Sequence, residues 1–154
     1  MEVVIEIPKL EDLREVNLIA KQVQDLHVNW NPDLYLNVDE VISKELFEKK
    51  IQSKQIFIAK LQGTIVGYIA FNISEKINPL MRYRKQLSIE AICVNETNRG
   101  KGIGTLLLQH VKNIGKENNC TDIQLSVNQN NRDAIHVYEK FGLKVKNITY
   151  SMKI

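Results

Sequence analysis

The chain has few cysteines. Only Cys93 and Cys120 occur among its 154 residues, and their spacing is not that of metal ligands. Small thiols of this kind are typical of buried apolar positions in a reducing compartment. We therefore expect no metal site, no disulfide bond and a cytoplasmic location.

Long hydrophobic runs and blocks of one charge are also lacking. No apolar run is long enough to cross a bilayer, and the first residues lack the basic start and apolar core of a targeting segment. Lys and Arg number 21 against 18 Asp and Glu, with no basic cluster along the chain. The sequence thus indicates neither a membrane partner nor a nucleic-acid partner.

The rest of the composition fits one globular domain over residues 1–154, because 44% of the residues are hydrophobic and no linker or repeat interrupts the chain. Apolar periodicity predicts alternating strands and helices in a mixed α/β (α+β) fold. The expected strands are 3–7, 56–61, 64–71, 87–94, 122–127, 143–145 and 148–152, and the expected helices are 10–26, 41–51, 103–114 and 134–141.

The most informative segment is a glycine turn between a predicted strand and a predicted helix. The apolar strand ends near Val94, the turn reads Arg99-Gly100-Lys101-Gly102-Ile103-Gly104, and Thr105 begins an apolar stripe. Glycines let a phosphate approach the backbone, and a helix N-terminus offers free N–H groups to an anion. The turn therefore predicts a ligand that carries phosphate.

Two familiar phosphate loops do not fit this turn. Lys101 is followed by Gly102, whereas a nucleotide-triphosphate loop needs Ser or Thr after its lysine. A dinucleotide fingerprint needs an acidic residue at the end of the next strand, where Val127 and Asn128 stand. The spacing Arg-x-x-Gly-x-Gly at Arg99, Gly102 and Gly104 instead resembles the pyrophosphate loop of the GNAT superfamily of N-acetyltransferases.

A second segment carries the same resemblance. Asn131, Ala134, Tyr138 and Gly142 are similar to the GNAT pattern Asn-x-x-Ala-x-x-x-Tyr-x-x-x-Gly-Phe, except that Leu143 stands in place of the final Phe. The resemblance covers roughly residue 65 to the C-terminus. It implies a GNAT fold with about seven strands, splayed between the fourth and fifth, and four flanking helices.

The resemblance also implies acetyl-coenzyme A (acetyl-CoA) as co-substrate. Its pantetheine arm would pair with the backbone of the strand that ends at Val94, and its diphosphate would rest on the glycine turn. The implied contacts are Ile92, Cys93, Val94, Arg99, Gly100, Lys101, Gly102, Ile103, Gly104, Thr105, Asn131, Ala134, Tyr138 and Lys140.

Two residues are candidates for the chemistry of amine acetylation. An alkylamine is almost wholly protonated at neutral pH, so a proton acceptor is useful, and Glu90 matches the family's frequent base position, where it would act as the base or hold the substrate's ammonium group. The simpler alternative is that Glu90 faces solvent or a lysine. Tyr138 matches the residue that would protonate the departing sulfur, although it can equally fill the core beside Val137 and Phe141. Because no cysteine matches a covalent nucleophile, we expect direct transfer in a ternary complex.

The acceptor site is less well defined. His27, Trp30 and Tyr35 lie in a segment similar to one that covers the acceptor in some GNAT proteins, although a lone histidine is more often a packing residue. The acceptor would be a small-molecule or peptide amine, and its identity is not encoded in any motif. A homodimer is compatible with the resemblance. The alternative function is a non-catalytic acyl-CoA sensor or interaction module.

Overall fold

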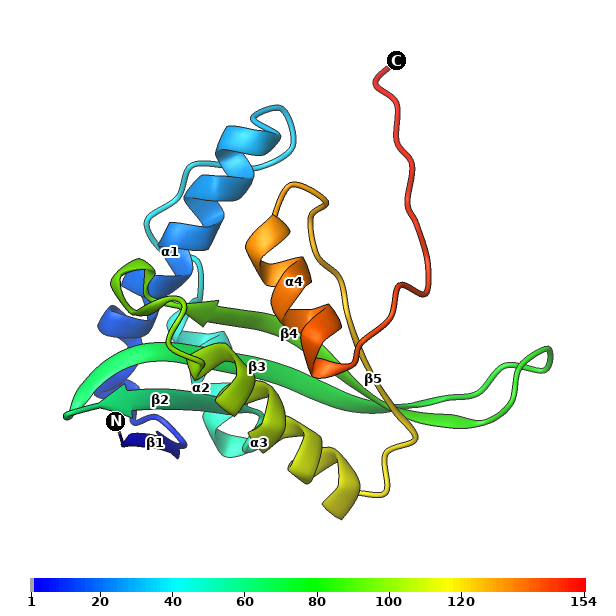
Figure 1. Cartoon of the computed structure of the whole chain (residues 1–154), viewed down its shortest axis with the longest axis horizontal. Coiled ribbons are helices and arrows are strands. Elements are labelled where there is room, and N and C mark those ends of the chain that lie inside the picture. Colours follow the sequence, from blue (N-terminus) through cyan, green and yellow to red (C-terminus); the bar gives the residue numbers. More distant parts are fainter. Residues whose placement is uncertain (1) are drawn as a thin grey trace.

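A five-stranded sheet forms the centre of the computed structural model, which describes residues 2–154 (Figure 1). The strands lie in chain order, and all neighbours are antiparallel except the last pair, which is parallel. A parallel pair needs a crossover, and a helix supplies it here. The strands are β1 (Val3–Glu6), β2 (Ile56–Leu61), β3 (Thr64–Lys76), β4 (Arg84–Val94) and β5 (Asp122–Leu125).

Helices cover both faces of the sheet and divide the core into two clusters. One cluster joins α1 and α2 to the sheet through Val16 and Phe47, and the other joins α3 through Leu107 and Val111. Strand alternation explains the division, because consecutive side chains point to opposite faces. The helices are η1 (Leu10–Asp12), α1 (Leu13–Trp30), α2 (Lys44–Gln52), η2 (Glu96–Asn98), α3 (Ile103–Glu117) and α4 (Arg132–Phe141).

Strand β4 is paired unevenly along its length. Its first half, residues 86–89, pairs with β3 on one side and with β5 on the other. Beyond Ile89 the pairing with β5 stops, while pairing with β3 continues to Val94. Residues 90–94, here named the open edge of β4, therefore border the sheet opening that the resemblance implies.

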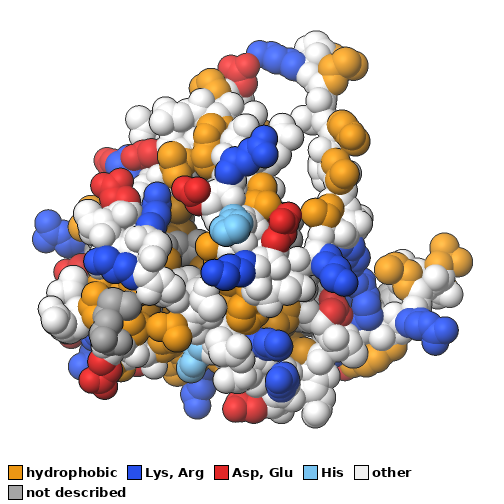
Figure 2. Space-filling view, in the orientation of Figure 1, with side chains coloured by type: hydrophobic (Ala, Val, Ile, Leu, Met, Phe, Trp, Pro, Cys, Tyr) orange, Lys and Arg blue, Asp and Glu red, His pale blue; other side chains and the backbone are white. Residues whose placement is uncertain are grey.

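The expectation of about seven strands is wrong, because the described residues 2–154 form five. The segments 143–145 and 148–152 alternate as strands do, but the structure gives them no strand partner. Residues 143–154, here named the tail, instead run in an extended course away from the body (Figure 1). Figure 2 shows apolar side chains along the tail, standing apart from the body. Alternation predicts a strand only where a second edge is available to pair with it.

The expected loop at 72–85 is also shorter than predicted. Strand β3 continues to Lys76 and β4 begins at Arg84, so the two extend together as an antiparallel arm beyond the rest of the sheet (Figure 1).

The second helix begins at Lys44 rather than at Val41. The preceding Val41 and Ile42 are held by hydrogen bonds from their backbone N–H groups to Asn17 Oδ1. Within residues 2–154, no helix has the length and apolar character to cross a membrane.

Candidate active site

The glycine turn lies between β4 and α3, where the sequence predicts it. Gly100 and Gly102 have φ angles of +77° and +81°, in the left-handed region that favours glycine. Gly102 is the N-cap of α3, and its carbonyl oxygen accepts the first helical hydrogen bond, from Leu106 N–H at 3.1 Å. The N–H groups of residues 103–105 therefore precede the first helical bond and remain available to an anion.

Arg99 connects this turn to the open edge of β4. Its Nε donates a hydrogen bond to the Val94 carbonyl oxygen at 3.0 Å. Lys101 is exposed beside it. The turn thus combines backbone N–H donors with two cationic side chains, as recognition of a diphosphate requires.

Backbone geometry shows which way the open edge of β4 points. Asn95 N–H donates to the Val66 carbonyl oxygen at 2.8 Å, on the β3 side. Successive strand residues direct their hydrogen-bonding groups to alternate sides, so Val94 and Ile92 direct theirs away from β3. The Val94 carbonyl oxygen accepts from Arg99, and the Val94 N–H faces the side on which pairing with β5 has already ended.

A bulge at Glu90 produces this direction. Ala70 pairs with Ala91 and Phe71 pairs with Ile89, so Glu90 is an extra residue on β4. Before the bulge, the Lys85 carbonyl oxygen accepts from Thr121 N–H, on the β5 side. After the bulge, Asn95 faces β3. Lys85 and Asn95 are an even number of positions apart, so in a regular strand both would face the same side. The extra residue reverses the alternation and turns the Ile92 and Val94 backbone toward the opening.

Glu90 itself pairs with a lysine. A lysine partner was the simpler alternative to a role of Glu90 in the chemistry. Its carboxylate accepts a hydrogen bond from Lys50 Nζ on α2 and forms an ion pair with it. Lys50 also donates to the Phe71 carbonyl oxygen at 2.7 Å, and its side chain is 13% exposed, against 43% for Glu90. The carboxylate is therefore partly open to solvent while its partner is fixed.

Tyr138 lies half-buried on α4, packed against the α3-side core. Burial raises the pKa of its hydroxyl to about 12, with a smaller contribution from nearby Cys93. The phenol therefore keeps its proton throughout the neutral range. Cys93, which follows Ile92 on β4, is buried, and desolvation raises the pKa of its thiol to about 11.

The other predicted cofactor residues lie around the start of α4 and along it. Asn131 is the N-cap of α4, and its Oδ1 accepts from Ala134 N–H at 3.3 Å. That bond gives Asn131 a structural role in addition to the predicted one. Ala134 is half-buried and Lys140 is exposed on the last turn.

The three predicted acceptor residues form one aromatic cluster. The His27 ring stacks on Tyr35 at 4.9 Å between centroids and lies 5.8 Å from Trp30. Burial lowers the pKa of His27, which favours the neutral ring. The structure therefore brings together residues from the end of α1 and from the following loop.

Two hydrogen bonds hold α1, which carries most of this cluster, beside the sheet opening. Gln22 of α1 accepts a hydrogen bond from Glu96 N–H at 3.0 Å, immediately after β4. Asn128, which follows β5, donates from Nδ2 to Asn31 Oδ1 at 3.2 Å. The end of α1 thus contacts the segments that follow both strands of the opening. Sequence reasoning did not single out Lys50, Gln22 or Asn128, because their partners are distant in the chain.

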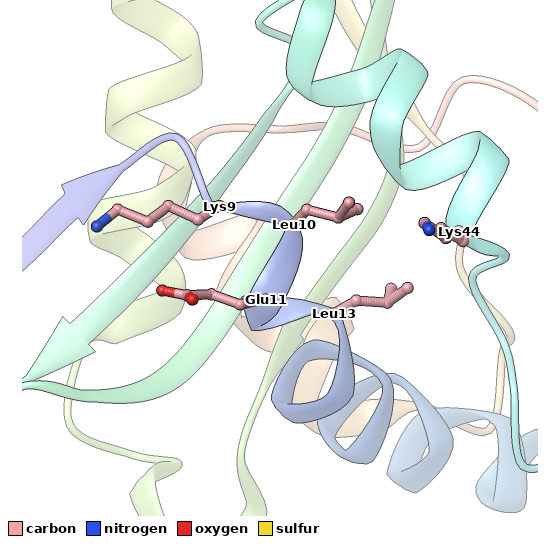
Figure 3. Close-up of a pocket in the computed structure, with 5 residues that line it drawn as sticks. All are labelled: Lys9, Leu10, Glu11, Leu13 and Lys44. Carbon is pink, nitrogen blue, oxygen red and sulfur yellow. The ribbon is translucent and has the colours of Figure 1, made fainter.

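A surface hollow elsewhere is not part of this arrangement. Figure 3 shows its lining residues, Lys9, Leu10, Glu11, Leu13 and Lys44, from η1 and the first turns of α1 and α2. None of them belongs to the glycine turn, the open edge of β4 or the aromatic cluster. Within residues 2–154, no group of three metal-ligating side chains lies close together.

The chain is similar to known acetyltransferases. The acetyltransferase (GNAT) family model matches residues 21–143. Streptothricin acetyltransferase from Streptomyces lavendulae is 32% identical over 52% of this chain and 39% of that protein. An N-alpha-acetyltransferase from Saccharolobus solfataricus is 34% identical over 57% of this chain and 55% of that protein. The chain thus spans about half, or less, of these relatives.

One solved structure resembles nearly the whole chain. A mutant of the BH1408 protein from Bacillus halodurans superposes with a TM-score of 0.93, covering 98% of this chain and 99% of that chain. Its sequence identity is 24%, so this likeness is one of fold.

Proposed function

The chain belongs to the acetyltransferase (GNAT) family, and from this premise we propose that it transfers the acetyl group of acetyl-CoA to a primary amine. Members of the family use acetyl-CoA. The observation that supports the proposal is the open edge of β4, which lacks β5 on its outer side and is followed by a glycine turn at the start of α3. We propose that the backbone N–H groups of this turn, the Val94 N–H and the Tyr138 hydroxyl act together on one bound acetyl-CoA.

The donors fit the chemical groups of acetyl-CoA in order along the opening. N–H groups of residues 99–105, with Arg99 and Lys101, would hold the diphosphate. The backbone of Ile92 and Val94 would pair with the amides of the pantetheine arm as an added strand does. When bound, acetyl-CoA supplies the activated acetyl thioester. The Val94 N–H would then donate to the acyl oxygen as negative charge develops there.

Tyr138 is the proposed proton donor to sulfur. Its high pKa keeps the hydroxyl protonated, so it can donate a hydrogen bond to the sulfur as the carbon–sulfur bond breaks. Attack by the amine forms the carbon–nitrogen bond, and the carbon–sulfur bond breaks after it. Tyr138 would then protonate the sulfur, so that the coenzyme leaves as a free thiol, while the amine loses one proton and solvent returns a proton to the Tyr138 oxygen. We therefore assign Tyr138 the role of catalytic acid.

Glu90 is the proposed site for the amine's proton or for its ammonium group. An ammonium ion of pKa about 10.4 must lose a proton before it attacks, at a cost of about 4 to 5 kcal/mol at neutral pH. A carboxylate that is held by Lys50 and partly open to solvent can accept this proton directly or through water. The ion pair fixes the position of Glu90 and competes with an incoming ammonium for the same oxygens.

Direct transfer in a ternary complex is the proposed sequence. Cys93 is the cysteine nearest the opening, but it is 6% exposed and burial raises the pKa of its thiol to about 11. A thiol in this state is a poor nucleophile, since the thiolate is the reactive form. The acetyl group would therefore pass from sulfur to the amine without an acetylated cysteine.

The acceptor would lie against His27, Trp30 and Tyr35. A neutral imidazole and two aromatic rings can pack on an alkyl or ring-bearing amine and attract its cation through their π faces. The relatives named above are, by name, a streptothricin acetyltransferase and an N-alpha-acetyltransferase. We propose a small-molecule or peptide amine of this general class.

Two measurements test the proposal. Calorimetry with acetyl-CoA should show saturable binding, and a thiol-release assay with a panel of polyamines, aminoglycosides, amino acids and peptides should reveal at least one acceptor. Release should require both substrates, and mass spectrometry should find no acetylated enzyme. No binding of acetyl-CoA would refute the assignment. Binding without turnover for any amine would instead favour an acyl-CoA sensor.

A further inference from the structure

The ion pair between Lys50 and Glu90 differs from an ordinary surface ion pair. Lys49, the preceding residue on α2, pairs with Glu45 one helical turn away, and these side chains are 71% and 82% exposed. Lys50 instead reaches from α2 to β4, is 13% exposed and also donates to the Phe71 carbonyl oxygen at 2.7 Å. Water and salt screen a pair of the first kind, whereas a lysine held by two acceptors keeps its charge in one place. The charge of Glu90 is therefore compensated by a fixed cation.

Glu90 and the aromatic cluster lie on the same face of the sheet. Helices α1 and α2 contribute to one core cluster and α3 to the other, so α1 and α2 share the face opposite α3 (Figure 1). Lys50 reaches Glu90 from α2, and His27 and Trp30 belong to the end of α1. An amine that lies against these rings therefore meets the ion pair of Glu90 and Lys50 rather than a free carboxylate.

The polar side chains next to Glu90 on this face are neutral. Ser88 precedes Glu90 by two positions on β4, and Ile89 between them belongs to the core cluster on the α3 side. Strand alternation thus places Ser88 on the face of Glu90, and Asn72 of β3 pairs with Ser88. Both side chains can form hydrogen bonds, but neither carries charge.

The carboxylates near the rings are also largely compensated. Residues 25–40 contain four acidic side chains, and within the described part of the chain three of them form ion pairs. Asp25 and Asp39 pair with Lys21, and Asp33 pairs with Lys153. These surroundings leave little negative charge for a second ammonium group on the acceptor.

We infer that Lys50 sets the charge class of the acceptor: it neutralises Glu90, and the site therefore favours an amine with a single positive charge over a polyamine. This inference rests on the proposed function and adds to it the kind of amine. The second ammonium group of a polyamine would lose water without gaining a free carboxylate, and it would meet the charge of Lys50. Neutral groups beside the reacting amine, as in an amino sugar or a peptide N-terminus, match Asn72 and Ser88. Lys50 acts through Glu90 and is a positioning residue.

The first test compares aminohexanol with hexanediamine, which differ only in a terminal hydroxyl or ammonium group. In the thiol-release assay the wild type should have the higher kcat/KM with aminohexanol. Lys50→Met should raise the ratio of kcat/KM for the diamine to that for the alcohol by about tenfold or more, because Glu90 is then uncompensated. The gain should come from a lower KM for the diamine, while kcat falls for both amines. A wild type that prefers the diamine, or an unchanged ratio in Lys50→Met, would overturn the inference.

Two further variants separate this effect from a general loss of charge. Lys50→Arg keeps the cation and should keep the wild-type preference. Lys60→Met removes a lysine that pairs with Glu6 at 2.7 Å, with side chains 26% and 43% exposed, on the β1–β2 side of the sheet. It should leave the ratio unchanged. Equal shifts in Lys50→Met and Lys60→Met would show that the site at Glu90 does not select by charge.

Binding measurements distinguish this inference from the proposed function. Calorimetry with the same two amines, in the presence of coenzyme A, requires no turnover. Lys50→Met should bind hexanediamine about tenfold more tightly than the wild type does, and high salt should reduce the gain because it screens the exposed carboxylate. Equal affinities would overturn the inference even if thiol release were normal. Selective binding without thiol release from any amine would instead count against the proposed function.

Discussion

The two halves of β4 have the same sequence character but different surroundings. Residues 86–89 pair with strands on both sides, and Leu87 is fully buried there. Residues 90–94 are also rich in apolar side chains, yet β5 is absent from their outer side. The first half is held in the sheet on both sides, and the second half has no strand on its outer side.

The two halves of β4 thus differ in pairing without a change in side-chain type. Side chains of the open edge still pack into the two core clusters, as Cys93 and Val94 do. What differs is the backbone, which the bulge at Glu90 turns toward the opening. Substitutions in the paired half should therefore affect stability, and substitutions around the open half should affect binding and catalysis.

The largest effect on catalysis is expected at Tyr138, beside the open half. Tyr138→Phe removes the hydroxyl but keeps the ring, so kcat should fall about 100-fold or more while acetyl-CoA affinity is retained. The control is Tyr83→Phe, which removes an exposed hydroxyl bonded to Glu75 on the arm. Steady-state thiol release and calorimetry separate the two quantities. Wild-type turnover in Tyr138→Phe would exclude its role as the acid.

The corresponding change in the paired half is Leu87→Ala. Because Leu87 is fully buried between the sheet and α3, its truncation should lower the free energy of unfolding by about 2–5 kcal/mol. Ile92→Ala, in the half-buried open half, should cost less. Urea denaturation measures both. If Leu87→Ala weakened acetyl-CoA binding in the folded protein more than Ile92→Ala does, the division between the halves would be wrong.

A pair of glycines tests the proposed role of the glycine turn, which follows the open half, in phosphate binding. Gly102 and Gly63 have φ angles of +81° and +79°, and a Cβ at either position would meet no atom within 4 Å. Alanine at each should therefore cost a similar amount of stability, about 1–2 kcal/mol. Only Gly102→Ala should also reduce acetyl-CoA affinity, by about tenfold, because its turn carries the proposed diphosphate donors. Equal affinities in the two variants would contradict this assignment.

Local signals in the sequence were enough to predict the turn and the helices around it. The glycine spacing predicted a turn before a helix, and Gly100 and Gly102 have left-handed φ angles in that turn. Gly142, which belongs to the second motif, ends α4 at φ +115°. The family, the mixed α/β fold and the clustering of His27 with Trp30 and Tyr35 were likewise expected. Each of these features depends on residues close together in the chain or on a motif.

Features that depend on distant partners could not be predicted in the same way. The Lys50–Glu90 pair joins α2 to β4, and no pattern near either residue indicates the other. The bulge follows from the pairing of β4 with β3 and leaves no mark in the alternation of residues 87–94. The tail was assigned two strands because its own alternation permits them, but alternation does not show whether a segment pairs with a sheet edge.

A smaller effect is expected at the bulge, where the two halves of β4 meet. If Glu90 accepts the amine's proton, Glu90→Gln should lower kcat/KM about tenfold near neutral pH. This loss is smaller than the roughly 100-fold or more that a general base usually contributes. The deficit should shrink as pH rises, because more of the amine is already unprotonated. Glu75→Gln on the arm is the matched control. A pH profile identical to that of the wild type would leave Glu90 with a structural role beside Lys50.

The smallest effect concerns His27, which lies against Tyr35 near the end of the open half. Burial lowers the pKa of His27 in the folded protein, so below the unfolded value of about 6.5 the unfolded chain binds a proton that the folded chain does not. Stability should therefore decline as pH falls through this value. His27→Phe should make that decline slightly shallower, while His110, whose pKa is also lowered by burial, contributes equally in both proteins. Urea midpoints at pH 7.5 and 5.5 measure the difference, and the exposed His136→Phe should not reproduce it.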